Sequence, residues 1–156
     1  MKIHIIGAPG SGKTYLACAL SRQYGVPRYE LDDIFFDNTG HAYCIRNSEQ
    51  ERAELLAKIL SQESWIIEGV YYKWLGESFA QADKIIIVKA PPIVRDFRII
   101  KRYINRKLGF EKEKDGSLRA LLALLKWNHG YDADFEKNAM QALGSFKSKC
   151  DYYPQI

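Results

Sequence analysis

The residues best suited to chemistry lie near the start of the chain, where residues 7–14 read GAPGSGKT. This is the G-x-x-x-x-G-K-[ST] pattern of a phosphate-binding loop, whose backbone N–H groups point inward at a phosphate chain. We expect Lys13 to reach the β- and γ-phosphates and the hydroxyl of Thr14 to bind Mg²⁺. The predicted nucleotide-binding residues are Gly7, Ala8, Pro9, Gly10, Ser11, Gly12, Lys13 and Thr14.

The residues on either side of this segment match the structure that such a loop requires. A short apolar run, residues 3–6, precedes it, and apolar residues with helical spacing follow it at Leu16, Ala17, Leu20 and Tyr24. This strand–loop–helix order argues against a chance glycine-rich turn, and the start of the helix adds its positive end to the phosphate site.

Two neighbouring acids, Asp32 and Asp33, end a short strand predicted at 28–31. A carboxylate there can hold a water of the Mg²⁺ shell or accept a proton from an attacking hydroxyl. We assign Asp32 to Mg²⁺ through a water and Asp33 to the acceptor molecule. The alternative is that the pair only caps the following turn.

A third acid closes the strand predicted at 65–67, as Glu68-Gly69. Glu68 can assist Mg²⁺ or the acceptor, and Gly69 lets a ligand approach the backbone closely. The alternative is a simple strand-ending turn. Lys73 follows within an aromatic segment and can reach an acceptor phosphate, although aromatic clusters are more often part of the core.

Four arginines, Arg95, Arg98, Arg102 and Arg106, share one face of a helix predicted at 92–108. Arginine clusters clamp phosphoryl oxygens and neutralise charge in the transition state. A solvated helix face and a nucleic-acid-binding stripe are the alternatives. Beside a phosphate-binding loop we favour a lid, residues 95–116, with the polar, glycine-bounded segment 109–116 as its mobile part.

Strand-like and helix-like segments alternate along the chain, which predicts an α/β fold with a mostly parallel sheet. Residues 1–156 are expected to form a single domain with a small acceptor-binding helical region at 33–62. In open sheets of this class the ligand lies beyond the carboxyl ends of the strands. The predicted strands are 2–6, 28–31, 65–67 and 84–88, and the predicted helices are 48–62 (with a Ser48/Glu51 capping box), 92–108, 117–127 and 132–149.

Composition excludes several other classes of protein. No apolar run approaches the length of a membrane span, and no signal peptide fits ahead of a loop so close to Met1. Three scattered cysteines, Cys18, Cys44 and Cys150, predict reduced thiols and a cytoplasmic location. A net charge of +4 is too small to indicate nucleic acid by itself. We expect no metal site beyond Mg²⁺.

Taken together, these motifs resemble the P-loop kinases of the adenylate kinase and shikimate kinase type. Within that group the chain is most similar to the topology modulation proteins, or FlaR-related proteins, over about residues 1–110. The segments that carry the resemblance are HIIGAPGSGKTYLA, YELDDIFFD, IRNSEQERAELL, WIIEGVYYKWLGESFAQAD and the Arg95/Arg98 pair.

The resemblance implies a three-layer P-loop NTPase fold with strand order 2-3-1-4, a fifth strand at the chain end, and helices on both faces. It implies an ATP site, a lid, and an ATP- and Mg²⁺-dependent phosphotransferase acting on a small acceptor. The alternative is a nucleotide-dependent regulator of DNA topology that binds nucleic acid or a protein. A GTPase switch is disfavoured because no N-K-x-D tetrad occurs. The predicted acceptor-binding residues are Asp33, Glu68, Gly69, Lys73, Arg98 and Arg102, and Arg95 and Arg98 are the predicted catalytic arginines.

Overall fold

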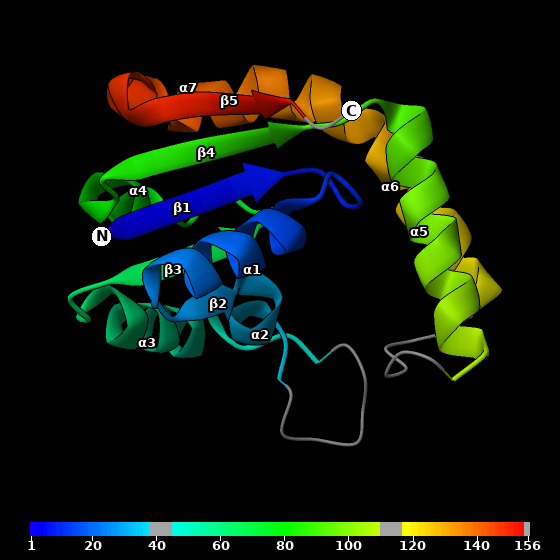
Figure 1. Ribbon diagram of the computed structural model, residues 1–156, viewed down its shortest axis with the longest axis horizontal. Coiled ribbons are helices and arrows are strands. Elements are labelled where there is room, and N and C mark those ends of the chain that lie inside the picture. Colours follow the sequence, from blue (N-terminus) through cyan, green and yellow to red (C-terminus); the bar gives the residue numbers. More distant parts are fainter. Residues whose placement is uncertain (38–44, 110–116, 155–156) are drawn as a thin grey trace.

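The computed structural model, which describes residues 1–37, 45–109 and 117–154, contains a five-stranded sheet whose strands are all parallel. The strand order is β2-β3-β1-β4-β5, as expected from the sequence (Figure 1). The chain end supplies a full fifth strand, because all five of its residues pair with β4. The strands are β1 (Lys2–Gly7), β2 (Arg28–Glu30), β3 (Trp65–Gly69), β4 (Lys84–Lys89) and β5 (Cys150–Pro154).

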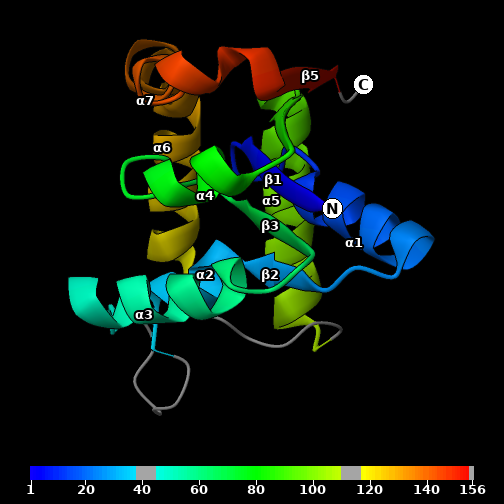
Figure 2. The same cartoon turned by 90° about the vertical axis from the view of Figure 1, so that its left-hand side faces the viewer.

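Helices flank the sheet on both faces, and Figure 2 shows α1 on the side opposite α4, α6 and α7. A π-helical turn, Phe135–Ala139, follows α6, and a 3-10 helix, Gly144–Lys149, precedes β5. The α-helices are α1 (Lys13–Tyr24), α2 (Leu31–Phe35), α3 (Glu49–Leu60), α4 (Gly76–Gln81), α5 (Pro92–Lys107), α6 (Leu118–Asp134) and α7 (Met140–Ala142).

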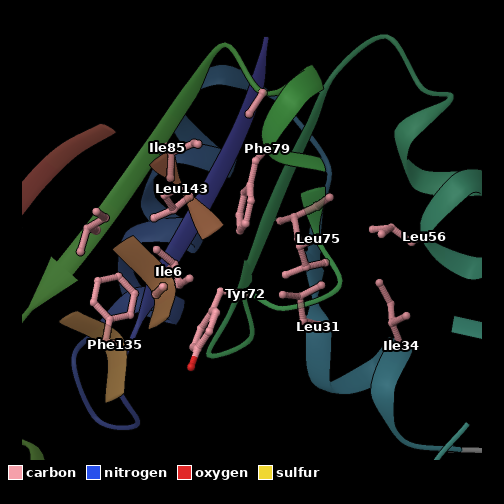
Figure 3. Packing of buried hydrophobic residues seen from close by; sticks show 14 of the residues in the cluster. Ile6, Leu31, Ile34, Leu56, Tyr72, Leu75, Phe79, Ile85, Phe135 and Leu143 are labelled. Carbon is pink, nitrogen blue, oxygen red and sulfur yellow. The ribbon is translucent and has the colours of Figure 1, made fainter. Parts of the chain in front are cut away.

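Alternate side chains of the strands enter two separate hydrophobic clusters, as a pleated sheet requires. Ile5 and Val88 pack toward Ala17 of α1 on one face. Ile6 and Ile85 belong to the larger cluster on the other face, which Figure 3 shows in close view. Burial of both faces explains why β1, β3 and β4 are mostly apolar between their ends, with His4 as a buried polar exception in β1.

Local sequence signals explain several helix boundaries. Helix α3 begins after Ser48, whose side chain and that of Glu51 form the predicted capping box. Helix α6, by contrast, continues past residue 127, where we expected a break. Gly130 weakens a helix by about 1 kcal/mol relative to alanine, but the neighbouring Asn128 and Tyr131 are buried. Tertiary packing therefore overrides the local preference.

Helices α5 and α6 pack against each other beyond the carboxyl ends of the strands (Figure 1). The face of α5 that carries the arginines is buried or half-buried. The opposite face is exposed and apolar, and it consists of Ile93, Phe97, Ile100, Ile104 and Leu108. Residues 110–116, the predicted mobile part of the lid, lie outside the described residues.

Two further expectations concern the chain as a whole. Cys18 and Cys150 are free thiols, as predicted, while Cys44 lies outside the described residues. None of the helices in the described part of the chain has the length and apolar character needed to cross a membrane.

Candidate functional site

The glycine-rich loop, residues 7–14, connects the end of β1 to the start of α1 at Lys13. Gly10 and Gly12 have φ values of 73° and 101°, a region that side chains other than glycine rarely adopt. A Cβ on Gly10 would lie 2.7 Å from the carbonyl oxygen of Arg95 on α5. The loop is thus folded tightly between the end of the sheet and α5. At position 10, glycine is required both by the backbone conformation and by the lack of space for a side chain.

A cavity of about 540 Å³ opens directly over this loop. Its floor is formed by Pro9, Gly10, Gly12, Lys13 and Thr14, and a hydrophobic rim comes from Phe36, Val70, Tyr71, Leu124 and Trp127. We call this space the large cavity. Two charged sides face each other across it: an acid wall of Glu30, Asp32 and Glu68, and an arginine wall of Arg98, Arg102 and Arg106.

Lys13, Thr14 and Glu68 meet at the bottom of the large cavity. The Thr14 hydroxyl donates a hydrogen bond of 2.6 Å to Glu68 Oε1, and Lys13 Nζ donates one of 3.2 Å to the carbonyl of Ala8. The parallel register places Glu68 beside Ile5 of β1, so both strands end at the loop. Burial lowers the pKa of Lys13 and raises the pKa of Glu68, and each charge partly offsets the effect on the other.

The sequence analysis did not assign Glu30, which belongs to the acid wall. Glu30 pairs in register with Glu68, so the two carboxylates end neighbouring strands. Arg28 binds both, with Nη1 at 2.5 Å from Glu30 Oε1 and 3.9 Å from Glu68 Oε1. The signal was present in the sequence, because an acid that ends a strand of a parallel sheet faces the same edge as the other strand ends.

Asp32 and Asp33 point in different directions, as predicted, but they do so because they lie on a helix and not at the end of a strand. Strand β2 ends at Glu30, so Asp32 and Asp33 lie in the first turn of α2 rather than at a strand end. Consecutive side chains on a helix point about 100° apart. Asp32 lines the large cavity, whereas Asp33 does not. Asp33 is therefore not positioned as the acceptor-binding residue that we expected.

Asp32 also has an aromatic neighbour at the rim. Burial raises the pKa of Tyr71, and the negative charge of the Asp32 carboxylate adds to the rise. The ring of Tyr71 stacks on that of Phe35, with centroids 4.6 Å apart. Tyr71 also lines the large cavity, so the predicted aromatic segment is partly core and partly site.

Three of the four predicted arginines reach the large cavity. Arg98 Nη1 donates to the carbonyl oxygens of Gly10 at 3.2 Å and Ser11 at 3.3 Å, which ties α5 to the glycine-rich loop. Arg102 and Arg106 follow at one-turn intervals along the same wall. The shared helical face expected from the spacing agrees with the place of these three residues along one cavity, and their role in binding a phosphoryl group stays a prediction.

Arg95 is the exception, and its predicted phosphate-clamping position is wrong. Its side chain is 1% exposed, and its two Nη atoms donate to the carboxylate of Asp132 at 2.8 and 2.7 Å. It lines a second, small cavity of about 170 Å³ at the ends of β1 and β4, beside Tyr131 and Phe135. Asp132 lies 37 residues away on α6, so the spacing within α5 carries no sign of this pairing.

Two other predicted residues have different surroundings from those expected. Gly69 lines the large cavity, but a Cβ there would lie 2.7 Å from the side chain of Leu31, so packing also requires glycine. Lys73 is exposed, and its Nζ lies 5.9 Å from the ring centre of Tyr72. It does not line the large cavity.

Within the described ranges, no group of three or more His, Cys, Asp or Glu side chains is arranged to hold a metal ion. The hydroxyl of Thr14 and the carboxylates of Glu68 and Asp32 nevertheless offer oxygen atoms around one space. Mg²⁺ prefers oxygen ligands and keeps several waters and substrate oxygens in its shell. These residues fit that ion in company with a phosphate chain.

Comparison with known proteins identifies no family for this chain. No family model matches it, and no curated protein matches it. A solved structure, that of an uncharacterized protein from Eubacterium ventriosum ATCC 27560, is similar to it with a TM-score of 0.52 at 15% identity. The match covers 100% of this chain and 90% of the other. At this identity the similarity concerns the fold alone.

Proposed function

We propose that this protein is an ATP-dependent phosphotransferase of the P-loop kinase class that uses Mg²⁺ and acts on a small acceptor. One observation carries the proposal: the glycine-rich loop, Lys13 and Thr14 form the floor of a cavity with carboxylates on one side and arginines on the other. Phosphoryl transfer requires little covalent chemistry from a protein, and positioning with charge neutralisation supplies most of the catalysis.

The loop and α1 would hold the phosphate chain of ATP. The φ values of Gly10 and Gly12 suit a loop that turns its N–H groups inward, and α1 begins at Lys13. Lys13 is held near the loop by the Ala8 carbonyl, from which its ammonium can turn to the β- and γ-phosphates. Its low exposure strengthens that attraction because little water screens it.

Thr14 and Glu68 would hold Mg²⁺, Thr14 directly and Glu68 directly or through water, while Asp32 would face the acceptor. When bound, the ion would neutralise charge on the phosphate chain. The hydrogen bond between Thr14 and Glu68 keeps the threonine side chain oriented toward this position. Arg98, Arg102 and Arg106 would bind the transferring group from the opposite wall, where planar guanidinium groups match phosphoryl oxygens.

The alternative, a regulator that binds nucleic acid through the arginines, receives less support. Arg98 contacts the glycine-rich loop, and Arg102 and Arg106 turn toward the cavity rather than forming an outward stripe. The exposed face of α5 is mainly apolar, with Lys101 and Lys107 as its exposed cations. A surface that binds a phosphate backbone needs its cations exposed along one face.

A coupled assay of ADP release over a panel of nucleosides, nucleotides and sugars tests the proposal. We expect acceptor-dependent ADP release and negligible binding of duplex DNA at physiological salt. Filter binding at two salt concentrations serves as the comparison. Tight DNA binding that weakens by about 0.9 log unit per phosphate contact with each log unit of salt, without any acceptor-dependent ADP release, would contradict the kinase proposal.

A further inference from the structure

We infer that the acceptor reacts through a hydroxyl group and carries no phosphate at its reacting end, so that the enzyme phosphorylates an alcohol such as a nucleoside and not a nucleoside monophosphate. This inference rests on the proposed function, and it names the chemical class of the second substrate. It derives from the distribution of charge in the large cavity.

The side of the cavity across from the arginines is strongly acidic. Glu30 and Glu68 end the neighbouring strands β2 and β3, Asp32 lies in the first turn of α2, and all three line the cavity. A phosphate dianion placed here would lie beside Asp32 and beside Glu30 and Glu68, whose shared partner Arg28 offsets only part of their charge. An alcohol there meets hydrogen-bond acceptors, which is what its O–H group requires.

Three arginines lie near this wall in the described part of the chain, and none of them lines the cavity. Arg28 is bound by Glu30 and Glu68. Arg46 and Arg52 lie over the ring of Phe35, at 5.5 and 5.0 Å from its centre, and neither lines the cavity.

The remaining cationic side chains of the cavity are expected to bind the nucleotide. Lys13 lies on the floor formed by the glycine-rich loop, and the arginine wall contacts that loop through Arg98. Both are therefore expected to bind the phosphates of ATP and the group in transfer. An acceptor phosphate would have no counter-charge of its own on the acid wall.

The reaction follows from this arrangement. The acceptor oxygen attacks the γ-phosphorus of ATP, a new P–O bond forms, and the bond from the γ-phosphorus to the bridging oxygen breaks to leave ADP. Asp32 accepts the hydroxyl proton as the oxygen attacks and later releases it to water.

The rim indicates what the rest of the acceptor is like. Phe36 and Tyr71 lie on the side of the acid wall, and Leu124 and Trp127 close the opposite side. Trp127 is 47% exposed, so its indole presents a flat surface to an incoming molecule. Aromatic rings of this kind stack on planar groups. A nucleoside joins a planar base to free hydroxyls and suits both parts of the cavity.

Isothermal titration calorimetry on protein saturated with a non-hydrolysable ATP analogue and Mg²⁺ tests the inference. The probe is AMP, titrated into the wild type, into Glu30→Gln/Asp32→Asn, and into Glu63→Gln/Glu77→Gln, a control that removes the same number of charges at exposed positions. We expect no AMP binding to the wild type or the control, and at least a tenfold gain in affinity for the double variant. AMP binding to the saturated wild type, or no gain in the double variant, would overturn the inference.

Failure of the underlying proposal is distinguishable in the same experiment. If the ATP analogue itself does not bind, the nucleotide site is wrong and the acceptor assignment falls with it. If the analogue binds but AMP binds beside it, only the acceptor class is wrong. In the ADP-release assay, a nucleoside monophosphate that reacts faster than the parent nucleoside would likewise overturn the alcohol assignment.

Discussion

Arg95 and Arg98 lie one turn apart on α5, yet they have opposite surroundings. Arg95 is buried in a bidentate ion pair with Asp132 of α6, whereas Arg98 donates to carbonyls of the glycine-rich loop and borders the large cavity. The first arginine fixes α5 to α6, and the second is available for a ligand. Residue type and helical spacing thus define which face a side chain is on, but the partner across that face decides its role.

The largest effect should follow from removing the available arginine. We expect Arg98→Ala to lower acceptor-dependent turnover by about 10³-fold, as loss of a transition-state arginine does in other phosphoryl-transfer enzymes. Thermal stability should change little, because Arg98 makes only two hydrogen bonds to loop carbonyls. Steady-state kinetics and thermal melts measure the two quantities.

Lys101→Ala serves as the matched control for Arg98→Ala, because Lys101 is an exposed cation on the same helix. Its turnover should equal that of the wild type. If both variants lost turnover equally, Arg98 would contribute only to the net positive charge of the helix. Arg98 would then have no specific role in catalysis to contrast with the structural role of Arg95.

Breaking the ion pair of Arg95 should lower the stability of the protein, in contrast to the loss of turnover expected for Arg98→Ala. Asp132→Asn leaves the buried Arg95 guanidinium without its counter-charge, but the Asp132 side chain is itself 55% exposed. Water can therefore partly replace the lost partner, and we expect a destabilisation of about 1–3 kcal/mol. Chemical denaturation should show this loss in the free energy of unfolding. A variant as stable as the wild type would show that Arg95 is not structurally required.

A smaller difference in turnover is expected between variants of the two aspartates of α2. Asp32→Asn removes the proton acceptor and should lower turnover by about 10²-fold, whereas Asp33→Asn should leave it near the wild-type rate because Asp33 does not line the cavity. Kinetics at saturating acceptor give the comparison. Equal rates in both variants would mean that Asp32 has no catalytic role.

Glu68 extends the comparison to a buried acid whose pKa is raised by burial from the ordinary value of 4.5. The folded protein therefore holds this proton more tightly than the unfolded chain, and the free energy of unfolding falls as pH rises above 4.5 through the folded pKa. Glu68→Gln should remove this loss and raise the Tm at pH 7 by about a few degrees without nucleotide.

Melts of Glu68→Gln and the wild type at two pH values check the sign. The difference in Tm should shrink at pH 4, where the wild-type carboxyl is protonated in both states. A variant that is less stable than the wild type at pH 7 would contradict the role assigned to burial of this carboxylate.

The fold was accessible from the sequence because its signals are local. Alternating apolar segments predicted the strands, the Ser48/Glu51 pair predicted the start of α3, and the strand order agreed with the resemblance. Helix α4 was not predicted, because six residues are too few to show a helical period. The break expected near Gly130 failed because burial of Asn128 and Tyr131 outweighs a weak local preference.

The site was predictable to the extent that its residues are close in sequence or repeat along one helix. The loop residues and the arginines from Arg98 onward are of this kind. The pairing of Arg95 with Asp132 and the register of Glu30 with Glu68 depend on contacts between distant segments. Lys73 was misassigned because a lysine near a site in sequence can still point away from it.

The central claim, that the glycine-rich loop is the nucleotide site, is tested most directly by calorimetry of ATP·Mg²⁺ binding to Lys13→Ala. We expect the wild type to bind ATP·Mg²⁺ and the variant to lose tight binding, while the circular dichroism spectrum and the cooperative melt of the variant are retained. Lys13 donates to the loop carbonyl of Ala8 and lies at the floor of the cavity, so its removal should not unfold the core. An ATP affinity unchanged in the variant would contradict the account.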